Sequence, residues 1–193
     1  MTSHRVALVT GANQGIGKSI VEQLLQHDTS LIVLLGSRNR DNGNNAVDEI
    51  KQKYNITNHR LQPIHIDLNS VDSIVSACDT VRSQYSRLDL LINNAGWASK
   101  GSTINEKIAH DTLEINYYGT KHVIDHFIPL MSHNNTRIIN VSSTSSAYAL
   151  RDMSKQHRAQ FLDDNLTVEK LESLLHEFID AVKQDKITEL GML

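Results

Sequence analysis

The sequence predicts an α/β fold built on a doubly wound parallel sheet. Short runs that are apolar throughout alternate with longer segments whose apolar residues recur at helical spacing. A glycine-rich turn follows the first apolar run directly, and no repeat or low-complexity stretch interrupts the alternation. Continuous apolar runs are typical of strands covered on both faces, and strand–helix alternation produces right-handed βαβ units.

Five strands are expected before residue 144. The first is short and apolar from end to end, as a strand buried on both faces must be. The third is weaker, because Pro63 has no N–H group to donate to a sheet ladder. The predicted strands are Arg5–Thr10, Leu31–Leu35, Leu61–Ile66, Leu88–Asn93 and Arg137–Ser142.

Four helices are expected between these strands. In the first, Ile16, Ile20 and Leu24 fall on one face, and in the third Ile74 and Cys78 do the same. The predicted helices are Gly15–His27, Asn42–Tyr54, Ser70–Tyr85 and Glu106–Met131.

The character of the chain changes after Ser143. Residues 144–166 are polar and are expected to be irregular, with one short helix around Met153–Leu162. Thr167 is a suitable N-cap for the strongly amphipathic helix that follows it.

Length, charge and cysteine usage limit the possible functions. The 193 residues suit one domain, expected as a βα core over 1–143 and a helical segment over 144–193. The net charge of −3 favours neither nucleic acid nor an anionic membrane as a partner. No apolar run approaches the roughly 20 residues of a membrane span, and the N-terminus does not resemble a secretory signal. Cys78 is the only cysteine, so no disulfide framework is possible and a cytoplasmic location is expected.

The stretch TGANQGIG, from Thr10 to Gly17, predicts a dinucleotide-binding turn. Gly11, Gly15 and Gly17 lie between the first strand and the first helix, where glycines let the backbone approach a pyrophosphate at a helix N-terminus. The alternative is a tight structural turn with no ligand. The dinucleotide interpretation predicts a Rossmann-type sheet of order 3-2-1-4-5, with the ligand across the carboxyl ends of strands 1 and 4.

The residues after the second strand favour NADP over NAD. An NAD-binding fold places an acidic residue there to hold the ribose 2′-hydroxyl. This chain has Ser37, Arg38 and Arg40, and the first carboxylate is Asp41. An arginine can pair with a 2′-phosphate in bidentate fashion. The alternative is that both arginines are simply solvated.

Four stretches point to a known family. They are the glycine turn, NNAG at 93–96, Asn116 within EINYYGT, and NVSS at 140–143. Together they resemble the short-chain dehydrogenase/reductase family, over essentially the whole chain. RVALVTGANQGIG, YSRLDLLINNAG and RIINVSS are most similar to the monomeric NADPH-dependent carbonyl reductases. The resemblance implies a monomer that reduces small-molecule ketones, aldehydes or quinones with NADP(H).

The resemblance also implies a set of cofactor-binding residues. Asp67, in the stretch HIDL, matches the family's adenine-contacting aspartate. The implied cofactor-binding residues are Gly11, Asn13, Gly15, Ile16, Gly17, Arg38, Asp67, Leu68, Asn94, Ala95 and Gly96.

The family's chemistry is carried by an Asn-Ser-Tyr-Lys set, of which Asn116 and Ser143 match the first two. The tyrosine protonates the substrate carbonyl, and the lysine must lower its pKa, because a free tyrosine has a pKa of about 10. No Tyr-x-x-x-Lys pair follows Ser143, since the only later tyrosine, Tyr148, has Asp152 four residues on.

Tyr117 and Lys121 have the required spacing, but they precede the serine strand, so a packing role is expected for them. The chain is therefore interpreted as a C-terminally truncated carbonyl reductase that ends after the fifth strand and an inserted helical segment. Two functions stay open: the reductase activity of the family, or a catalytically inactive NADP-binding module or non-functional fragment.

Several lesser features have structural interpretations. His122 and His126 could share a metal, but no third ligand is evident and no metal site is expected. Trp97 either flanks the entrance to the substrate site or only packs against neighbouring side chains. Cys78 is expected to be buried on a helix face. The truncation predicts that Arg137–Ser142 is an edge strand with no partner on its outer side.

Overall fold

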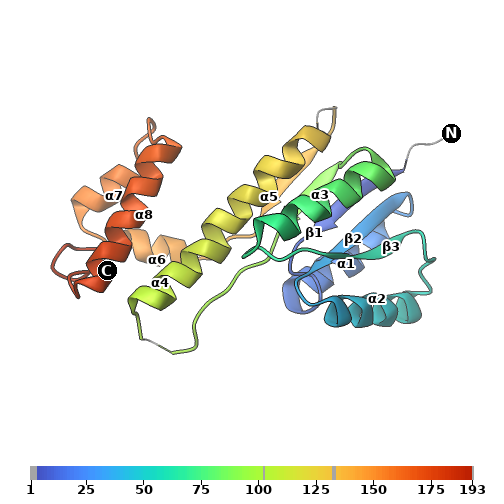
Figure 1. The fold of residues 1–193 in the computed structure, drawn as a ribbon, viewed down its shortest axis with the longest axis horizontal. Coiled ribbons are helices and arrows are strands. Elements are labelled where there is room, and N and C mark those ends of the chain that lie inside the picture. The colour runs from blue at the N-terminus through green and yellow to red at the C-terminus, as the bar shows by residue number, and fades with distance from the viewer. Residues whose placement is uncertain (1–3, 102, 132–133, 193) are drawn as a thin grey trace. The chain divides into compact units, whose positions relative to one another are not determined.

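The computed structural model describes residues 4–101, 103–131 and 134–192. A five-stranded sheet has the order β3-β2-β1-β4-β5, which confirms the predicted order. Strands β1, β2 and β3 are labelled in Figure 1 together with the helices beside them. Every neighbouring pair of strands is parallel, as a doubly wound fold requires. The strands are β1 (Arg5–Val9), β2 (Leu31–Ser37), β3 (Leu61–His65), β4 (Leu90–Asn93) and β5 (Arg137–Asn140).

The chain divides into two compact units, one made of residues 1–97 and 114–141, the other of residues 98–113 and 142–193. The first unit holds the sheet, and the expected helical segment 144–193 falls within the second. The helices that cover the sheet in the first unit are α1 (Gly15–His27), α2 (Arg40–Tyr54), α3 (Val71–Tyr85) and α5 (Thr120–Phe127).

Strand β1 shows why the predicted strands are apolar throughout. Val6 and Leu8 pack in a cluster with α3 and α5, whereas Ala7 and Val9 pack in a second cluster with α1 and α2. Successive side chains of a strand point to opposite faces, so a strand between two helix layers needs apolar residues at every position.

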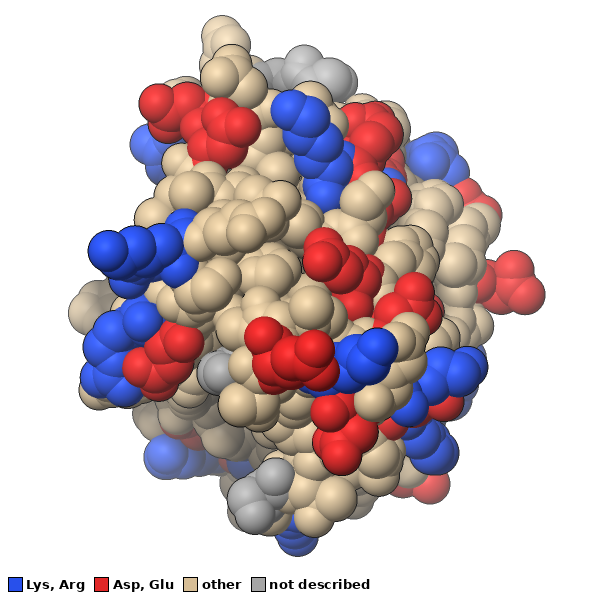
Figure 2. All heavy atoms as spheres, turned by 90° about the vertical axis from the view of Figure 1, so that its left-hand side faces the viewer, with Lys and Arg blue, Asp and Glu red and all other residues tan. Residues whose placement is uncertain are grey.

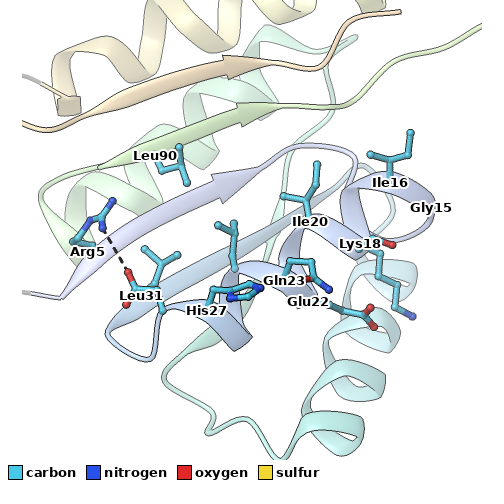
Figure 3. Close-up of a pocket in the computed structure, with 13 residues that line it drawn as sticks. Arg5, Gly15, Ile16, Lys18, Ile20, Glu22, Gln23, His27, Leu31 and Leu90 are labelled. Carbon is cyan, nitrogen blue, oxygen red and sulfur yellow. Dashed lines mark ion pairs between the residues drawn. The ribbon is translucent and has the colours of Figure 1, made fainter.

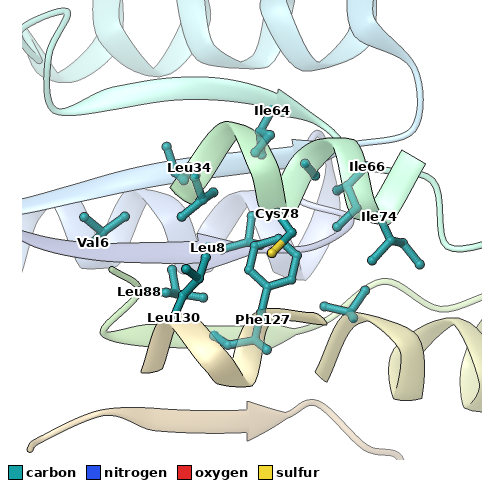
Figure 4. Packing of buried hydrophobic residues seen from close by; sticks show 14 of the residues in the cluster. Val6, Leu8, Leu34, Ile64, Ile66, Ile74, Cys78, Leu88, Phe127 and Leu130 are labelled. Carbon is teal, nitrogen blue, oxygen red and sulfur yellow. The ribbon is translucent and has the colours of Figure 1, made fainter. Parts of the chain in front are cut away.

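The first of these clusters is shown in Figure 4. Phe127 of α5 is fully buried and lies with Cys78 of α3 and Leu8 of β1 between the helices and the sheet (Figure 4). The expectation that Cys78 is a buried residue of a helix face is confirmed.

The long helix predicted over Glu106–Met131 is divided into four segments. A π-helical segment, η1 (Glu114–Gly119), separates α4 (Glu106–Leu113) from α5, and a 3₁₀ segment follows α5. Gly119 lets η1 approach the loop after β3, because a Cβ there would lie only 2.5 Å from the carbonyl oxygen of Leu68. An apolar period of 3.6 residues does not reveal a wider turn of this kind.

The second unit is helical. Residues 145–152 were expected to be irregular but form a helix, and a further helix begins at Lys155 behind the N-cap Ser154. The predicted N-cap Thr167 is confirmed, since its side chain accepts the N–H of Lys170 at 3.3 Å. The helices of this unit are α4, α6 (Ser145–Asp152), α7 (Lys155–Phe161) and α8 (Val168–Lys183).

Helices α4 and α8 pack together, and Lys183 Nζ and Glu106 Oε1 form an ion pair at 3.0 Å between them. Acidic and basic side chains are interspersed on the surface shown in Figure 2, without a broad area of one sign. This distribution agrees with the small net charge of −3.

The sheet is incompletely covered in the described part of the chain. Strand β5 pairs only with β4, and all four of its residues are exposed, including Ile138 and Ile139. An open hollow of about 1010 Å³ lies beside α1, with Ile20, Leu31 and Leu90 in its wall (Figure 3).

Candidate nucleotide-binding site

The glycine turn joins β1 to α1 at the carboxyl end of the sheet. Gly11 and Gly15 have φ angles of +62° and +57°, in the left-handed region that favours glycine. A Cβ on Gly11 would lie 2.7 Å from the Cα of Ala95, so the NNAG loop occupies the space that a side chain would need. The glycine turn and the NNAG loop are therefore in direct contact.

Buried Thr10 connects these two loops. Its Oγ1 accepts the backbone N–H groups of Asn94 and Ala95, each at 3.0 Å. In return, Nδ2 of Asn94 donates to the carbonyl oxygens of Thr10 at 2.9 Å and Gly11 at 3.1 Å. These bonds hold the glycine turn against a loop 84 residues away in the sequence.

The first turn of α1 also needs a glycine. A Cβ on buried Gly17 would lie 2.6 Å from the Gly11 carbonyl oxygen and would also meet the Asn94 side chain. The N-cap residue Gln14 makes no side-chain cap. The first-turn N–H groups of a helix have no intrahelical acceptor, and with the positive end of the helix dipole they suit a phosphate.

Arg38 stands at the opposite side of the site, directly after β2. Ser37, which is buried, donates its hydroxyl to the Asn39 carbonyl at 2.8 Å, and Asn39 caps α2 by accepting the N–H of Asn42 at 2.9 Å. The Arg38 side chain is exposed, and no acidic residue stands between Ser37 and Arg40.

These loops surround a cavity of about 400 Å³, here named the glycine-loop cavity. All of the residues implied as cofactor-binding line it: Gly11, Asn13, Gly15, Ile16, Gly17, Arg38, Asp67, Leu68, Asn94, Ala95 and Gly96. Five more lining residues were not predicted as cofactor contacts: Gln14, Ile66, Asn69, Trp97 and Ile115. All five are sequence neighbours of predicted residues, and Ile115 directly precedes Asn116 in the stretch EINYYGT.

The hollow beside α1 is larger but has a different character. Its wall is mostly apolar and includes Ile20, Leu31 and Leu90, and Arg5 also lines it (Figure 3). Arg5 forms an ion pair with Asp28 at 3.5 Å. Small-molecule sites combine apolar walls with a few converging polar groups. The glycine-loop cavity has that combination, so it is the candidate functional site.

Asn116, a predicted catalytic residue, lies in the π-helical segment η1. Its Oδ1 accepts the backbone N–H of Trp97 at 2.7 Å, and its Nδ2 donates to the Trp97 carbonyl at 2.8 Å. Asn116 thus holds the backbone of Trp97, a residue that lines the cavity.

Ser143, the other predicted catalytic residue, belongs to the second unit. Its hydroxyl donates to the Ser145 hydroxyl at 3.1 Å and accepts the Ser145 N–H at 3.1 Å, at the start of α6. The structure thus brings the implied cofactor residues together, and it leaves Ser143 in a separate compact unit.

The tyrosines and lysine considered from the sequence have local partners. The ring of Tyr117 packs edge-to-face on Tyr118, with centroids 4.9 Å apart, and Lys121 pairs with Asp125 at 3.2 Å. Tyr148 is 57% exposed, and Arg151 lies over its ring.

The remaining candidates carry no catalytic cluster. His126 shares a helix with His122, and within the described ranges no group of three metal-ligating side chains occurs. The Cys78 thiol donates to the His126 carbonyl at 3.1 Å, and burial raises the pKa of this thiol. Among the described residues, no helix is long and apolar enough to cross a membrane.

Comparison with known proteins agrees with this geometry. A family model described as short chain dehydrogenase matches residues 5–155. The chain belongs to the short-chain dehydrogenase family. Its fold, with a glycine turn facing an NNAG loop across the carboxyl ends of β1 and β4, is therefore that of a short-chain dehydrogenase.

Individual relatives are reductases and dehydrogenases. The chain is 33% identical to "Carbonyl reductase [NADPH] 1" of Bos taurus, over 94% of this chain and 64% of the relative. It is 31% identical to "(+)-neomenthol dehydrogenase" of Arabidopsis thaliana, over 96% of this chain and 69% of the relative. The solved structure of menthone neomenthol reductase from Mentha piperita superposes with a TM-score of 0.89 at 27% identity, covering 98% of this chain and 78% of that one.

The chain thus spans roughly two thirds of the length of these two sequence relatives. It is a short-chain dehydrogenase that resembles carbonyl reductases and neomenthol dehydrogenase.

Proposed function

We propose that this chain binds NADP(H) in the glycine-loop cavity, as the nucleotide-binding part of a reductase that acts on small ketones, aldehydes or quinones. The observation that supports this most strongly is that all of the residues implied as cofactor-binding line one cavity. The bovine relative, 33% identical, carries NADPH in its name. A bound NADPH would supply the hydride for reduction of a carbonyl.

The residues present suit such a coenzyme. An added Cβ on Gly11 would clash with Ala95, and one on Gly17 would clash with the Gly11 carbonyl oxygen, so both glycines let the turn pack closely against the NNAG loop. The first turn of α1 offers N–H groups to the pyrophosphate. Asp67, the residue proposed to contact the adenine, lines the same cavity together with Leu68.

Arg38 is the basis of the proposed preference for NADP(H). Arg38 is exposed and lines the cavity directly after β2. At this position an NAD-binding fold has a carboxylate. An arginine attracts a 2′-phosphate, and a carboxylate at that position would repel it.

We further propose that these 193 residues bind the coenzyme without reducing a carbonyl. Asn116 and Ser143 are the proposed members of the catalytic set, and the sequence has no Tyr-x-x-x-Lys pair after Ser143. Without a proton donor of tuned pKa, the carbonyl oxygen of a substrate cannot be protonated efficiently as the hydride reaches its carbon.

Trp97 provides a direct binding test, because it is the only tryptophan and it lines the cavity. Titration with NADPH should give saturable energy transfer from Trp97 to the nicotinamide. Gly17→Ala is the control, since its Cβ would lie 2.6 Å from the Gly11 carbonyl oxygen and should abolish the signal. Equal signals from both chains would refute the proposed binding site.

The same samples test turnover with menadione as the substrate. Binding without NADPH consumption is the expected result. Consumption would contradict the proposed inactivity, and the next variant would then be Tyr117→Phe, because Tyr117 and Lys121 have the required spacing.

A further inference from the structure

His65, the last residue of β3, joins the two loops that bound the far end of the glycine-loop cavity. Its Nε2 lies 3.1 Å from the Arg38 carbonyl oxygen, and its Nδ1 lies 3.3 Å from the Ser73 hydroxyl. The same hydroxyl oxygen accepts the backbone N–H of Asp67 at 3.0 Å. A continuous chain of hydrogen bonds therefore runs from Arg38 to Asp67, and both of these residues line the cavity.

The chemistry of the partners sets the direction of each bond. A carbonyl oxygen can only accept a hydrogen bond, so Nε2 of His65 carries the hydrogen and donates a hydrogen bond to the Arg38 carbonyl oxygen. In the neutral ring Nδ1 is then an acceptor, and it takes the hydroxyl hydrogen of Ser73. The Ser73 oxygen is left to accept the N–H of Asp67, so every member of the chain has a compatible role.

The Arg38 side chain is exposed, and a long exposed side chain has many rotamers. Its reach into the cavity depends on where the backbone of residue 38 is held. On one side, the Ser37–Asn39 turn fixes that backbone, through the 2.8 Å bond from the Ser37 hydroxyl. The bond from His65 is a second anchor, and it acts directly on the Arg38 carbonyl.

We propose that His65 is a positioning residue for coenzyme selectivity: it holds Arg38 where the guanidinium meets the ribose 2′-phosphate. The proposal rests on the proposed binding of NADP(H). It assigns different effects to the two ends of the chain. The Arg38 end acts only on the 2′-phosphorylated coenzyme, whereas the Asp67 end acts on the adenosine part that NADPH and NADH share.

The test compares NADPH and NADH affinities by energy transfer from Trp97 in the full 193-residue chain. His65→Phe keeps an aromatic ring but removes both hydrogen bonds. It should weaken NADPH binding by up to about tenfold, the effect of one lost hydrogen bond to the Arg38 carbonyl. NADH binding should change less than twofold, because the Ser73 hydroxyl oxygen still accepts the N–H of Asp67. The selectivity ratio should therefore fall by nearly the same factor.

Two further variants separate positioning from a merely structural role. His65→Gln retains a side-chain N–H that can reach the Arg38 carbonyl, so it should preserve most of the selectivity ratio. Ser73→Ala removes the link to Asp67 and should weaken both coenzymes alike, with the ratio unchanged. If His65→Phe only lost stability, its affinities for NADPH and NADH would fall together, and its NADPH/NADH selectivity ratio would stay at the wild-type value.

The outcomes distinguish this proposal from the proposed function. If the wild-type chain prefers NADPH and His65→Phe keeps that preference, the role of His65 is refuted and the proposed NADP(H) site stands. If the wild-type chain binds neither coenzyme, or binds both equally, the proposed NADP(H) preference fails and the role of His65 falls with it. If His65→Phe does not fold, His65→Gln decides, and a loss of selectivity in that variant contradicts the proposal.

Discussion

Asn116 binds the backbone of Trp97 at two points, through its Oδ1 to the N–H at 2.7 Å and through its Nδ2 to the carbonyl at 2.8 Å. The Asn116 amide thus satisfies both backbone groups of Trp97, as a neighbouring strand would, and fixes the residue that follows the NNAG loop. Asn116, predicted as catalytic, therefore holds in place the backbone of Trp97, a residue that lines the glycine-loop cavity.

Asn116→Asp should disturb this segment more than Asn116→Ala. The second carboxylate oxygen would face the Trp97 carbonyl, so one hydrogen bond is lost and two acceptors repel each other. We expect a loss of about 1–2 kcal/mol in the free energy of unfolding and a red shift of Trp97 emission. Asn45→Ala, on an exposed position of α2, is the control and should leave the emission unchanged. An unshifted emission spectrum in Asn116→Asp would show that the two hydrogen bonds from Asn116 do not fix the Trp97 backbone.

Gly119→Ala should destabilise the fold although alanine favours helices. The added Cβ would lie 2.5 Å from the Leu68 carbonyl oxygen and 2.7 Å from the Leu68 Cβ. Overpacking of this kind costs about 1–3 kcal/mol, more than the helix propensity that alanine gains. Urea denaturation measures the difference. Gly96→Ala is the matched substitution, because its Cβ would meet nothing closer than 3.5 Å, and a similar loss in both variants would refute the steric argument.

Asp89→Ala should be among the more destabilising substitutions in the first unit. The Asp89 side chain is almost fully buried, accepts the Val6 N–H at 2.8 Å and pairs with Arg87. Its removal leaves a buried backbone donor of β1 without this acceptor, which we expect to cost about 3 kcal/mol. Asp79→Ala breaks an exposed ion pair with Arg82 and should cost less than about 1 kcal/mol. Equal midpoints in thermal denaturation of the two variants would contradict this ranking.

The Cys78 thiol should react slowly in the folded chain. Burial raises its pKa, so the thiolate fraction near neutral pH is below that of a free cysteine. A pKa raised by folding means that the folded state binds this proton more tightly than the unfolded state. The free energy of unfolding should therefore be unaffected below the thiol's usual pKa and should decrease as the pH rises through it.

Reaction with a disulfide reagent provides the measurement, with the urea-unfolded chain as the reference. We expect the native chain to react at least about tenfold more slowly at neutral pH. Equal rates would show that α3 and α5 do not cover Cys78 in solution.

Much of the first unit follows from local sequence. The apolar runs predict all five strands, because a strand between two helix layers must be apolar on both faces. The glycine turn was recognisable for a similar reason: the positive φ angles of Gly11 and Gly15 and the close approach at Gly17 exclude larger residues. Some strand ends differ from the predicted ones: β2 extends to Ser37, and β5 ends at Asn140.

The helical predictions failed where the apolar period carried no information. The π-helical turn around Asn116 and the helix over residues 145–152 were not predicted. A wider turn depends on what the helix packs against, here Leu68 at Gly119. The segment 145–152 is short, and its residues are mostly polar or small, so its side chains form no apolar stripe.

The sequence by itself determined the strands and the glycine turn, because both depend on backbone preferences and apolar patterns within a short window. The dinucleotide interpretation of that turn implied the sheet order, and the resemblance to the short-chain dehydrogenase/reductase family implied the residues that line the cavity. Only the tertiary structure decided that Asn94 bonds to Thr10, that Asn116 holds Trp97, and that His65 connects Arg38 to Asp67 through Ser73. These are directional bonds whose partners come from different loops or elements. Their formation requires the packed sheet to bring the groups within about 3 Å, a condition that no local pattern contains.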